Sequence, residues 1–331
     1  MPETFRDIFS LFDFLKRKEC GCPGLLHPAP HFEYMVMNMI QDSKGLFQRN
    51  EDEPTEICAV PMPTNPLYRG QNCYYEVCKP TLYRSTWTRE ALFEREMQLA
   101  DFKFILNGHP EIKDRIKGGL KINYEGLAQH YGIPTEILDF TNSPLVAAFF
   151  ATTTYNPMTD TYSPILHSVS RGVIYVSLLG GLFESMNPDM SCTMPVGMDA
   201  LHRPGEQRAY GRKMKPEEDL NTTAGYNKLF FWHTPEASMK IWQMCNGEYG
   251  FFPYDPMAEK VRCIVKYRMY SDDALQEAYS HMPDFAANVD DARNKMISEG
   301  CNFVNYVPFA YTQDELSFVL NELHQMYPDS F

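Results

Sequence analysis

The segment Gly126–Ala151 restricts the possible folds of this chain more than any other part of the sequence. It reads GLAQHYGIPTEILDFTNSPLVAAFFA. Gly132 can end a helix, because glycine adopts the left-handed conformation without steric cost. Pro134 favours an extended chain before it, and Pro144 stands where prolines commonly begin a helix. The segment therefore predicts a helix, an extended piece and a second helix, in that order.

The same segment carries more polar side chains than a packed core needs. Asp139, Thr141 or Asn142 can cap the helix after Pro144, because their side-chain oxygens accept its free N–H groups. Capping does not explain His130, Tyr131 and Thr135. We interpret the polar residues as part of a binding pocket. The alternative is that they are buried and have a structural role, as hydrogen-bonding groups within the fold.

Other segments favour an α+β fold with helices early and late and strands between them. Apolar spacing predicts a helix at Thr88–Leu106, and the β-rich runs predict strands at Leu67–Gln71, Arg171–Leu179 and Val261–Tyr270. We expect mixed helices around a central antiparallel or split β-sheet. Residues 1–55 are interpreted as a helical or irregular extension and 56–331 as the main domain, with a loop-rich insertion near 180–235 and a helical C-terminal part.

Composition narrows the classes of function. The formal net charge is −13, which argues against a general basic surface for nucleic acid. The nine scattered cysteines and the charged residues among the first twenty indicate a cytoplasmic protein with reduced thiols. No apolar run is long enough to predict a membrane partner. No G-x-G-x-x-G, Walker, G-x-S-x-G or H-E-x-x-H motif occurs.

Four residues near the N-terminus are candidates for a metal site: Cys20, Cys22, His27 and His31. Their C-x-C pair lacks the usual spacing of zinc ligands. We therefore predict no metal and interpret them as loop residues.

Arg69 is the first candidate for ligand binding. It stands in LYRG at the end of a predicted strand, beside a glycine that lets a ligand approach the backbone. A guanidinium there suits a phosphate or a carboxylate. The alternative is an internal ion pair with Glu94 or Glu96 on the following helix.

These motifs together resemble the FRG domain family, which is named for a Phe/Tyr-Arg-Gly tripeptide. The resemblance rests on YRGQ at 68–71, LYRS at 82–85 and above all Gln129–Ala151, and it runs from Leu67 to about Phe252. Where the family tends toward Gln-x-Gly-x-Phe, this chain has Glu248-Tyr249-Gly250-Phe251.

The order of residues also resembles mono-ADP-ribosyltransferases, with Arg69 early, Thr135 to Thr141 before an Ala/Phe helix, and Glu248 late. That resemblance implies an ADP-ribosyltransferase-like fold with NAD as substrate and Arg69 and Glu248 as catalytic residues. Glu206 is the competing late carboxylate. The implied NAD contacts are Tyr68, Arg69, Gly70, His130, Tyr131, Thr135, Asp139 and Thr141.

The leading hypothesis is therefore an NAD-dependent ADP-ribosyltransferase that acts as a bacterial toxin or anti-phage effector. Its acceptor would be RNA, DNA or protein, and a neutralising antitoxin could be a partner. The alternatives are a noncatalytic module that senses a nucleotide or another ligand, and a structural interaction domain.

Overall fold

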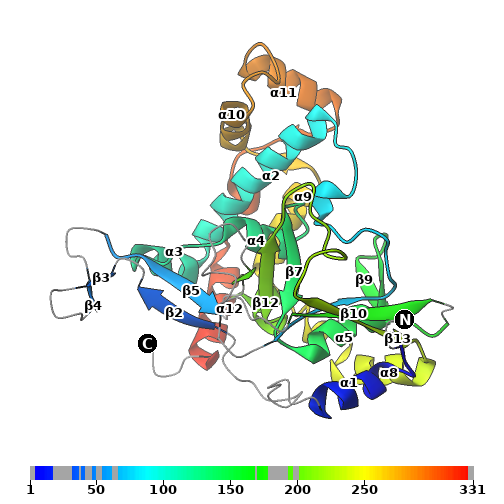
Figure 1. The fold of residues 1–331 in the computed structure, drawn as a ribbon. Coiled ribbons are helices and arrows are strands. Elements are labelled where there is room, and N and C mark those ends of the chain that lie inside the picture. Colours follow the sequence, from blue (N-terminus) through cyan, green and yellow to red (C-terminus); the bar gives the residue numbers. More distant parts are fainter. Residues whose placement is uncertain are drawn as a thin grey trace. The chain divides into compact units, whose positions relative to one another are not determined.

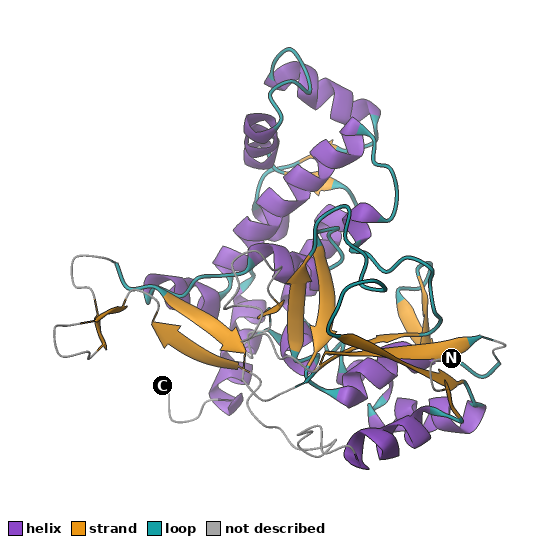
Figure 2. Cartoon of the chain, in the orientation of Figure 1, coloured by secondary structure: helices purple, strands orange, loops and turns teal. Residues whose placement is uncertain are grey.

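The structure is a computed structural model that contains both helices and strands (Figures 1 and 2). The chain divides into two compact units. It describes residues 4–17, 32–36, 39–41, 47–49, 54–61, 66–167, 170–177, 193–196 and 201–326. Unit 1 comprises residues 1–35, 59–80 and 136–253, and unit 2 comprises residues 36–58, 81–135 and 254–331. Strands β2 (Phe32–Val36) and β5 (Ile57–Pro61) cross the division between the units.

Unit 1 is built on a mixed sheet of seven strands within the described residues, in the order β1-β13-β10-β6-β7-β12-β11. All pairs are antiparallel except β1 with β13. The strands are β1 (Thr4–Phe5), β6 (Leu67–Gln71), β7 (Ile137–Thr141), β10 (Arg171–Ser177), β11 (Thr193–Pro195), β12 (Ala209–Lys213) and β13 (Tyr226–Trp232).

One face of this sheet packs against helices, and we call it the helix face. Its buried cluster joins Tyr68 of β6, Ile174 of β10 and Phe231 of β13 to apolar side chains of the helices α1 (Ile8–Arg17), α5 (Pro144–Thr152) and α8 (Pro235–Met244). The shorter elements of unit 1 are β8 (Thr153–Asn156), β9 (Thr161–Pro164), α7 (His202–Glu206) and the 3-10 turn η2 (Gly247–Gly250).

The opposite face carries a second buried cluster, and we call it the Tyr175 face. Leu67, Tyr175 and Phe230 lie there because side chains alternate along each strand, so neighbours of the helix-face residues point the other way. The remaining members of this cluster come from strands and from connecting segments: Cys78, Leu138, Phe140, Val173, Tyr210, Met214, Leu220 and Tyr226.

Helix α5 lies against the sheet at Gly70. A Cβ at this position would overlap the carbonyl oxygen of Ala147 and would lie 3.1 Å from the Cβ of Ala151. Ser143 caps the helix by accepting the N–H of Val146 at 3.4 Å. The run of small residues on α5 and the glycine on β6 together allow the helix to approach the strand closely.

Unit 2 is mostly helical. Its helices are α2 (Arg89–Gly108), α3 (Pro110–Lys117), α4 (Tyr124–His130), α9 (Pro256–Val265), α10 (Asp272–His281), α11 (Val289–Ser298) and α12 (Gln313–Met326). It also contains the 3-10 turns η1 (Thr81–Tyr83) and η3 (Val307–Phe309) and the pairs β3 (Met39–Gln41) with β4 (Phe47–Arg49) and β14 (Met269–Tyr270) with β15 (Asn302–Phe303).

The sequence correctly predicts the α+β class and most elements. Thr88 is the N-cap of α2, Gly132 has φ of +91° beyond α4, and α5 begins at Pro144. None of the described helices has the length and apolarity that crossing a membrane requires.

Three expectations need correction. The loops expected near 180–235 in fact contain β12 and β13, which are strands of the main sheet. The strand expected at 261–270 is largely helix α9, because Asp255 caps it and Pro256 begins it. The N-cap of α5 is Ser143 rather than Asp139, Thr141 or Asn142. The helical part expected in the N-terminal extension is α1, which packs in the helix-face core of unit 1.

The substitution Gly70→Ala tests the contact between α5 and β6. We expect it to lower the free energy of unfolding by about 3 kcal/mol, because the new methyl group meets backbone that cannot move alone. Urea unfolding followed by circular dichroism measures this loss. Gly132→Ala is the control, since its added Cβ meets nothing within 4 Å and strains only the backbone, at about 1 kcal/mol. Equal losses for the two variants would contradict the packing explanation.

Candidate functional site

Arg69 lies on the central strand β6, and the described residues satisfy only part of the hydrogen-bonding capacity of its guanidinium. Nη1 donates a hydrogen bond to the backbone oxygen of Asp139 at 2.8 Å. Nε is buried and has no hydrogen-bond acceptor among the described residues. No described carboxylate forms an ion pair with this side chain. A partly buried cation without a protein counter-charge is a candidate anchor for an anion.

The ion pair considered as the alternative for Arg69 does not form with either named carboxylate. Both belong to unit 2, where Glu94 binds Arg268 at 2.7 and 2.8 Å. Glu96 binds Arg95 at 2.6 Å and also lies 3.0 Å from His281.

The other two residues of the Tyr-Arg-Gly tripeptide have packing roles. Tyr68 is 1% exposed in the helix-face core, and Gly70 admits α5. Strand β6 pairs with β7 at Tyr68 and Thr141, and the Arg69 hydrogen bond links the same two strands beside that pair. Tyr68 and Gly70 therefore support the strand that presents Arg69.

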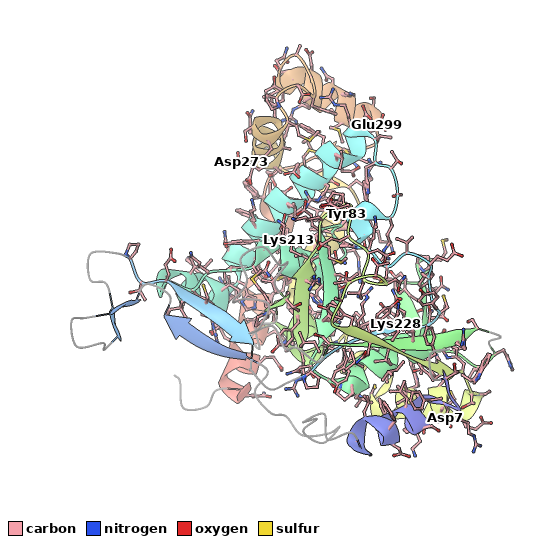
Figure 3. The ribbon with its side chains drawn as sticks, in the orientation of Figure 1. Asp7, Tyr83, Lys213, Lys228, Asp273 and Glu299 are labelled. Atoms are coloured by element: carbon pink, nitrogen blue, oxygen red, sulfur yellow. The ribbon has the colours of Figure 1, made fainter. Side chains whose placement is uncertain are left out.

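Arg69, Tyr175 and Lys228 form a row across three adjacent strands. Tyr175 is the register partner of Arg69 on one side and of Lys228 on the other, so all three side chains project from the Tyr175 face. Lys228, labelled in Figure 3, donates to the backbone oxygen of Asn221 at 2.7 Å and pairs with no described carboxylate. The row thus places one cationic side chain on each side of a tyrosine.

Tyr175 remains a neutral hydroxyl at ordinary pH. Burial is the main cause that raises its pKa above the usual value, and the positive charge of Arg69 opposes this shift. Its hydroxyl donates to Oδ1 of Asn221 at 2.8 Å. Tyr175 therefore contributes no negative charge against the two cations.

Glu248, Thr141 and Asp139 lie away from this row. Thr141 pairs with Tyr68 and therefore projects from the helix face. Asp139 is two residues away on the same strand, so its side chain projects from the helix face as well. Glu248 accepts the backbone N–H of Tyr162 at 2.8 Å, and Tyr162 packs against the helix-face cluster. Burial raises the pKa of Tyr162, and the nearby charge of Asp139 adds to the shift. The helix face thus carries Glu248 and the Asp139 side chain, whereas Arg69 projects from the other face.

His130, Tyr131 and Thr135 belong to unit 2. Tyr131 is buried and donates to Oδ2 of Asp255 at 2.7 Å, and Thr135 donates to Oε1 of Gln129 at 2.9 Å. His130 is the last residue of α4. Their expected contacts with NAD remain predictions. The metal candidates Cys20, Cys22, His27 and His31 lie outside the described residues.

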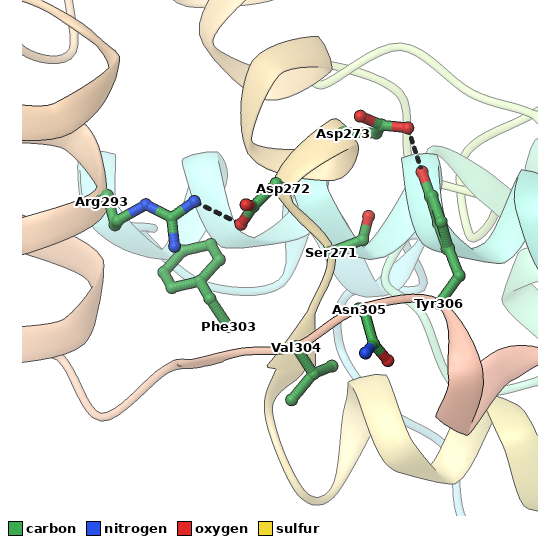
Figure 4. Close-up of a pocket in the computed structure, with 8 residues that line it drawn as sticks. All are labelled: Ser271, Asp272, Asp273, Arg293, Phe303, Val304, Asn305 and Tyr306. Carbon is green, nitrogen blue, oxygen red and sulfur yellow. Dashed lines mark hydrogen bonds and ion pairs between the residues drawn. The ribbon is translucent and has the colours of Figure 1, made fainter.

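Unit 2 also contains a pocket of about 430 Å³ that the sequence did not indicate (Figure 4). Arg293 forms an ion pair with Asp272, and Tyr306 donates to Asp273 at 2.9 Å. The guanidinium of Arg293 also lies 4.5 Å from the centre of the Phe303 ring. The single cation among the described pocket residues is paired with Asp272, and Asp273 accepts a hydrogen bond from Tyr306, so these contacts do not call for a ligand. The residues come from separate segments, and no single sequence motif joins them.

A buried carboxyl group lies beside this pocket. Both oxygens of Asp101 bind Ser271, which lines the pocket: Oδ1 accepts from the hydroxyl at 2.6 Å and Oδ2 from the backbone N–H at 2.9 Å. Burial is the main cause that raises the pKa of Asp101 to about 6, although the Ser271 bonds oppose it.

One comparison with known proteins gives a match. Residues 64–160 match the model of the FRG domain family, so the chain contains an FRG domain in this segment. No curated protein and no solved structure matches the chain. Arg69 lies inside the matched segment, whereas Tyr175, Lys228 and Glu248 lie beyond it. The likeness to ADP-ribosyltransferases consequently rests on residue order alone.

Asp101 should make unit 2 less stable as the pH rises. Between about pH 4 and pH 6 the folded protein binds a proton at Asp101 that the unfolded chain has released, so the free energy of unfolding falls through this window. The loss totals roughly 3 kcal/mol and is complete above the folded pKa. Urea unfolding at several pH values, compared with Asp101→Asn, isolates the effect. An equally large decrease in Asp101→Asn would contradict it.

Proposed function

We propose that the Tyr175 face binds a phosphate-bearing nucleotide, with NAD as the first candidate. The observation that carries the proposal is the pair of cations, Arg69 and Lys228, which flank Tyr175 without a described carboxylate partner. This function corresponds to a nucleotide-binding module and does not require a catalytic step.

The spacing of the cations suits a pyrophosphate. Their strands are separated by β10, which places their Cα atoms about 10 Å apart. Both side chains are long enough to converge on an anion between them. The planar guanidinium can donate two parallel hydrogen bonds to phosphate oxygens, and the ammonium adds a point charge. A bound anion would supply the negative charge that the described residues do not provide here.

Substitution of the two cations tests this binding. We expect Arg69→Lys and Lys228→Met each to weaken NAD binding about tenfold or more. The first removes the two parallel hydrogen bonds that only a guanidinium can donate, and the second removes a charge-assisted contact. Isothermal titration calorimetry measures the affinity. Lys213→Ala is the matched control, since Lys213 lies on the same sheet and pairs with Glu136 at 3.0 Å. If a variant with both substitutions bound NAD with wild-type affinity, the Tyr175 face would be excluded as the binding site.

ADP-ribosyl transfer is the second candidate function, and the position of Glu248 favours it. The carboxylate of Glu248 is partly buried and is fixed by the N–H of Tyr162 at 2.8 Å. Such a fixed negative charge can stabilise the positive charge that develops as the glycosidic bond of NAD breaks. A macromolecular acceptor, an antitoxin partner and a role as toxin or anti-phage effector belong to this candidate.

The two candidates assign their key residues to different faces of the sheet, so Glu248→Gln distinguishes them. For transfer, we expect this variant to release nicotinamide at least about 100-fold more slowly. Its amide oxygen can still accept the Tyr162 N–H, which preserves the fold. The assay is nicotinamide release from NAD with cell extract, and Glu236→Gln is the control, since Glu236 is an exposed residue of α8.

Slow release only in Glu206→Gln would move the catalytic role to that residue. Full release in both glutamine variants, or none in the wild type, would refute transfer at these carboxylates. Binding at the Tyr175 face does not depend on this result.

A further inference from the structure

Tyr74 presents an exposed aromatic ring at the Tyr175 face. It follows β6 by three residues and is 42% exposed. Among the described residues its ring contact is with Phe230, at 5.5 Å between centroids and an interplanar angle of 61°. The ring therefore rests by an edge contact on the sheet, and a large part of it faces solvent.

Register places Tyr74 near the cationic row. Val173 of β10 pairs with Gln71 on β6 and with Phe230 on β13. This row of paired residues lies two positions along the strands from the row of Arg69, Tyr175 and Lys228, so Phe230 projects from the same face as Arg69. Strand geometry puts the Cα atoms of Arg69 and Phe230 about 12 Å apart. An inorganic anion does not span this distance, whereas an extended nucleotide does.

The loop that carries Tyr74 is tied to the same row. Asn221 donates to the backbone oxygens of Tyr75 and Glu76 at 2.9 and 3.0 Å. The same Asn221 accepts the hydroxyl of Tyr175 and, through its backbone oxygen, the ammonium of Lys228. The loop of Tyr74 and the side chain of Lys228 are thus held by one hydrogen-bonded frame, and Tyr175 of this frame is the register partner of Arg69.

We propose that Tyr74 stacks on a flat ring of the ligand whose phosphates bind Arg69 and Lys228, an inference that rests on the function proposed above. Every nucleobase has an aromatic face, and a tyrosine provides a stacking surface for it. The phosphates alone do not distinguish a nucleotide from inorganic pyrophosphate. Tyr74 makes that distinction, so the site selects an anion that carries an aromatic ring.

Two probes separate the contributions of ring and phosphate: NAD and inorganic pyrophosphate. We expect Tyr74→Ala to weaken NAD binding roughly tenfold or more and to leave pyrophosphate binding unchanged. Tyr74→Phe keeps the ring and should bind NAD as the wild type does. Tyr75→Ala is the matched control, because Tyr75 is adjacent and 50% exposed and its hydroxyl donates to Asn72 at 3.3 Å.

Calorimetry on the full chain gives distinct outcomes. Unchanged NAD affinity in Tyr74→Ala, with pyrophosphate still bound through Arg69, would overturn the stacking role and leave the proposed function intact. Equal weakening of both probes would also overturn it, since it would show a structural effect. Failure of the wild type to bind either probe would refute the proposed function itself and the stacking role with it.

Discussion

The close approach of α5 to β6 is the constraint on which the arrangement of unit 1 depends. A glycine at position 70 leaves room for the backbone of Ala147, and the small residues of α5 let the helix lie flat on the strand. With the helix on one face, strand alternation fixes which side chains are buried beneath it. Tyr68 lies under the helix, and Arg69 has to project from the opposite face. The tripeptide that names the family thus combines two packing residues with one charged residue on the other side of the sheet.

This division into faces changes how the candidate residues relate to one another. Arg69 and Lys228 share the Tyr175 face, whereas Glu248 is fixed near Tyr162 on the helix face. A linear order of arginine, threonine-bearing strand and late glutamate resembles that of transferases, but linear order does not determine the face from which a side chain projects. The nucleotide-binding proposal depends on register, and register is visible only when strands are paired.

Sequence patterns predicted the elements whose signals are local. The helix start near Thr88, the glycine stop at 132 and the helix-initiating Pro144 are each decided by a few neighbouring residues. The prediction of a strand at 261–270 was wrong. It gave more weight to the β-branched residues of this segment than to the helix-start signal at Asp255 and Pro256. Lys228 could not be recognised from the sequence as a candidate binding residue. Its place beside Arg69 depends on the pairing of Tyr175 with both residues, and no local sequence pattern indicates this pairing.

The chain passes between the two units repeatedly, and the FRG segment takes part in this exchange. Residues 64–160 contribute β6, β7 and α5 to unit 1 and α2, α3 and α4 to unit 2. The strands that flank β6 and β7 on their other edges, β10 and β12, come from later in the chain. The segment defined by sequence similarity is therefore not a compact unit of this fold. Cut out at its matched bounds, it would leave β6 and β7 without the neighbouring strands that complete their sheet.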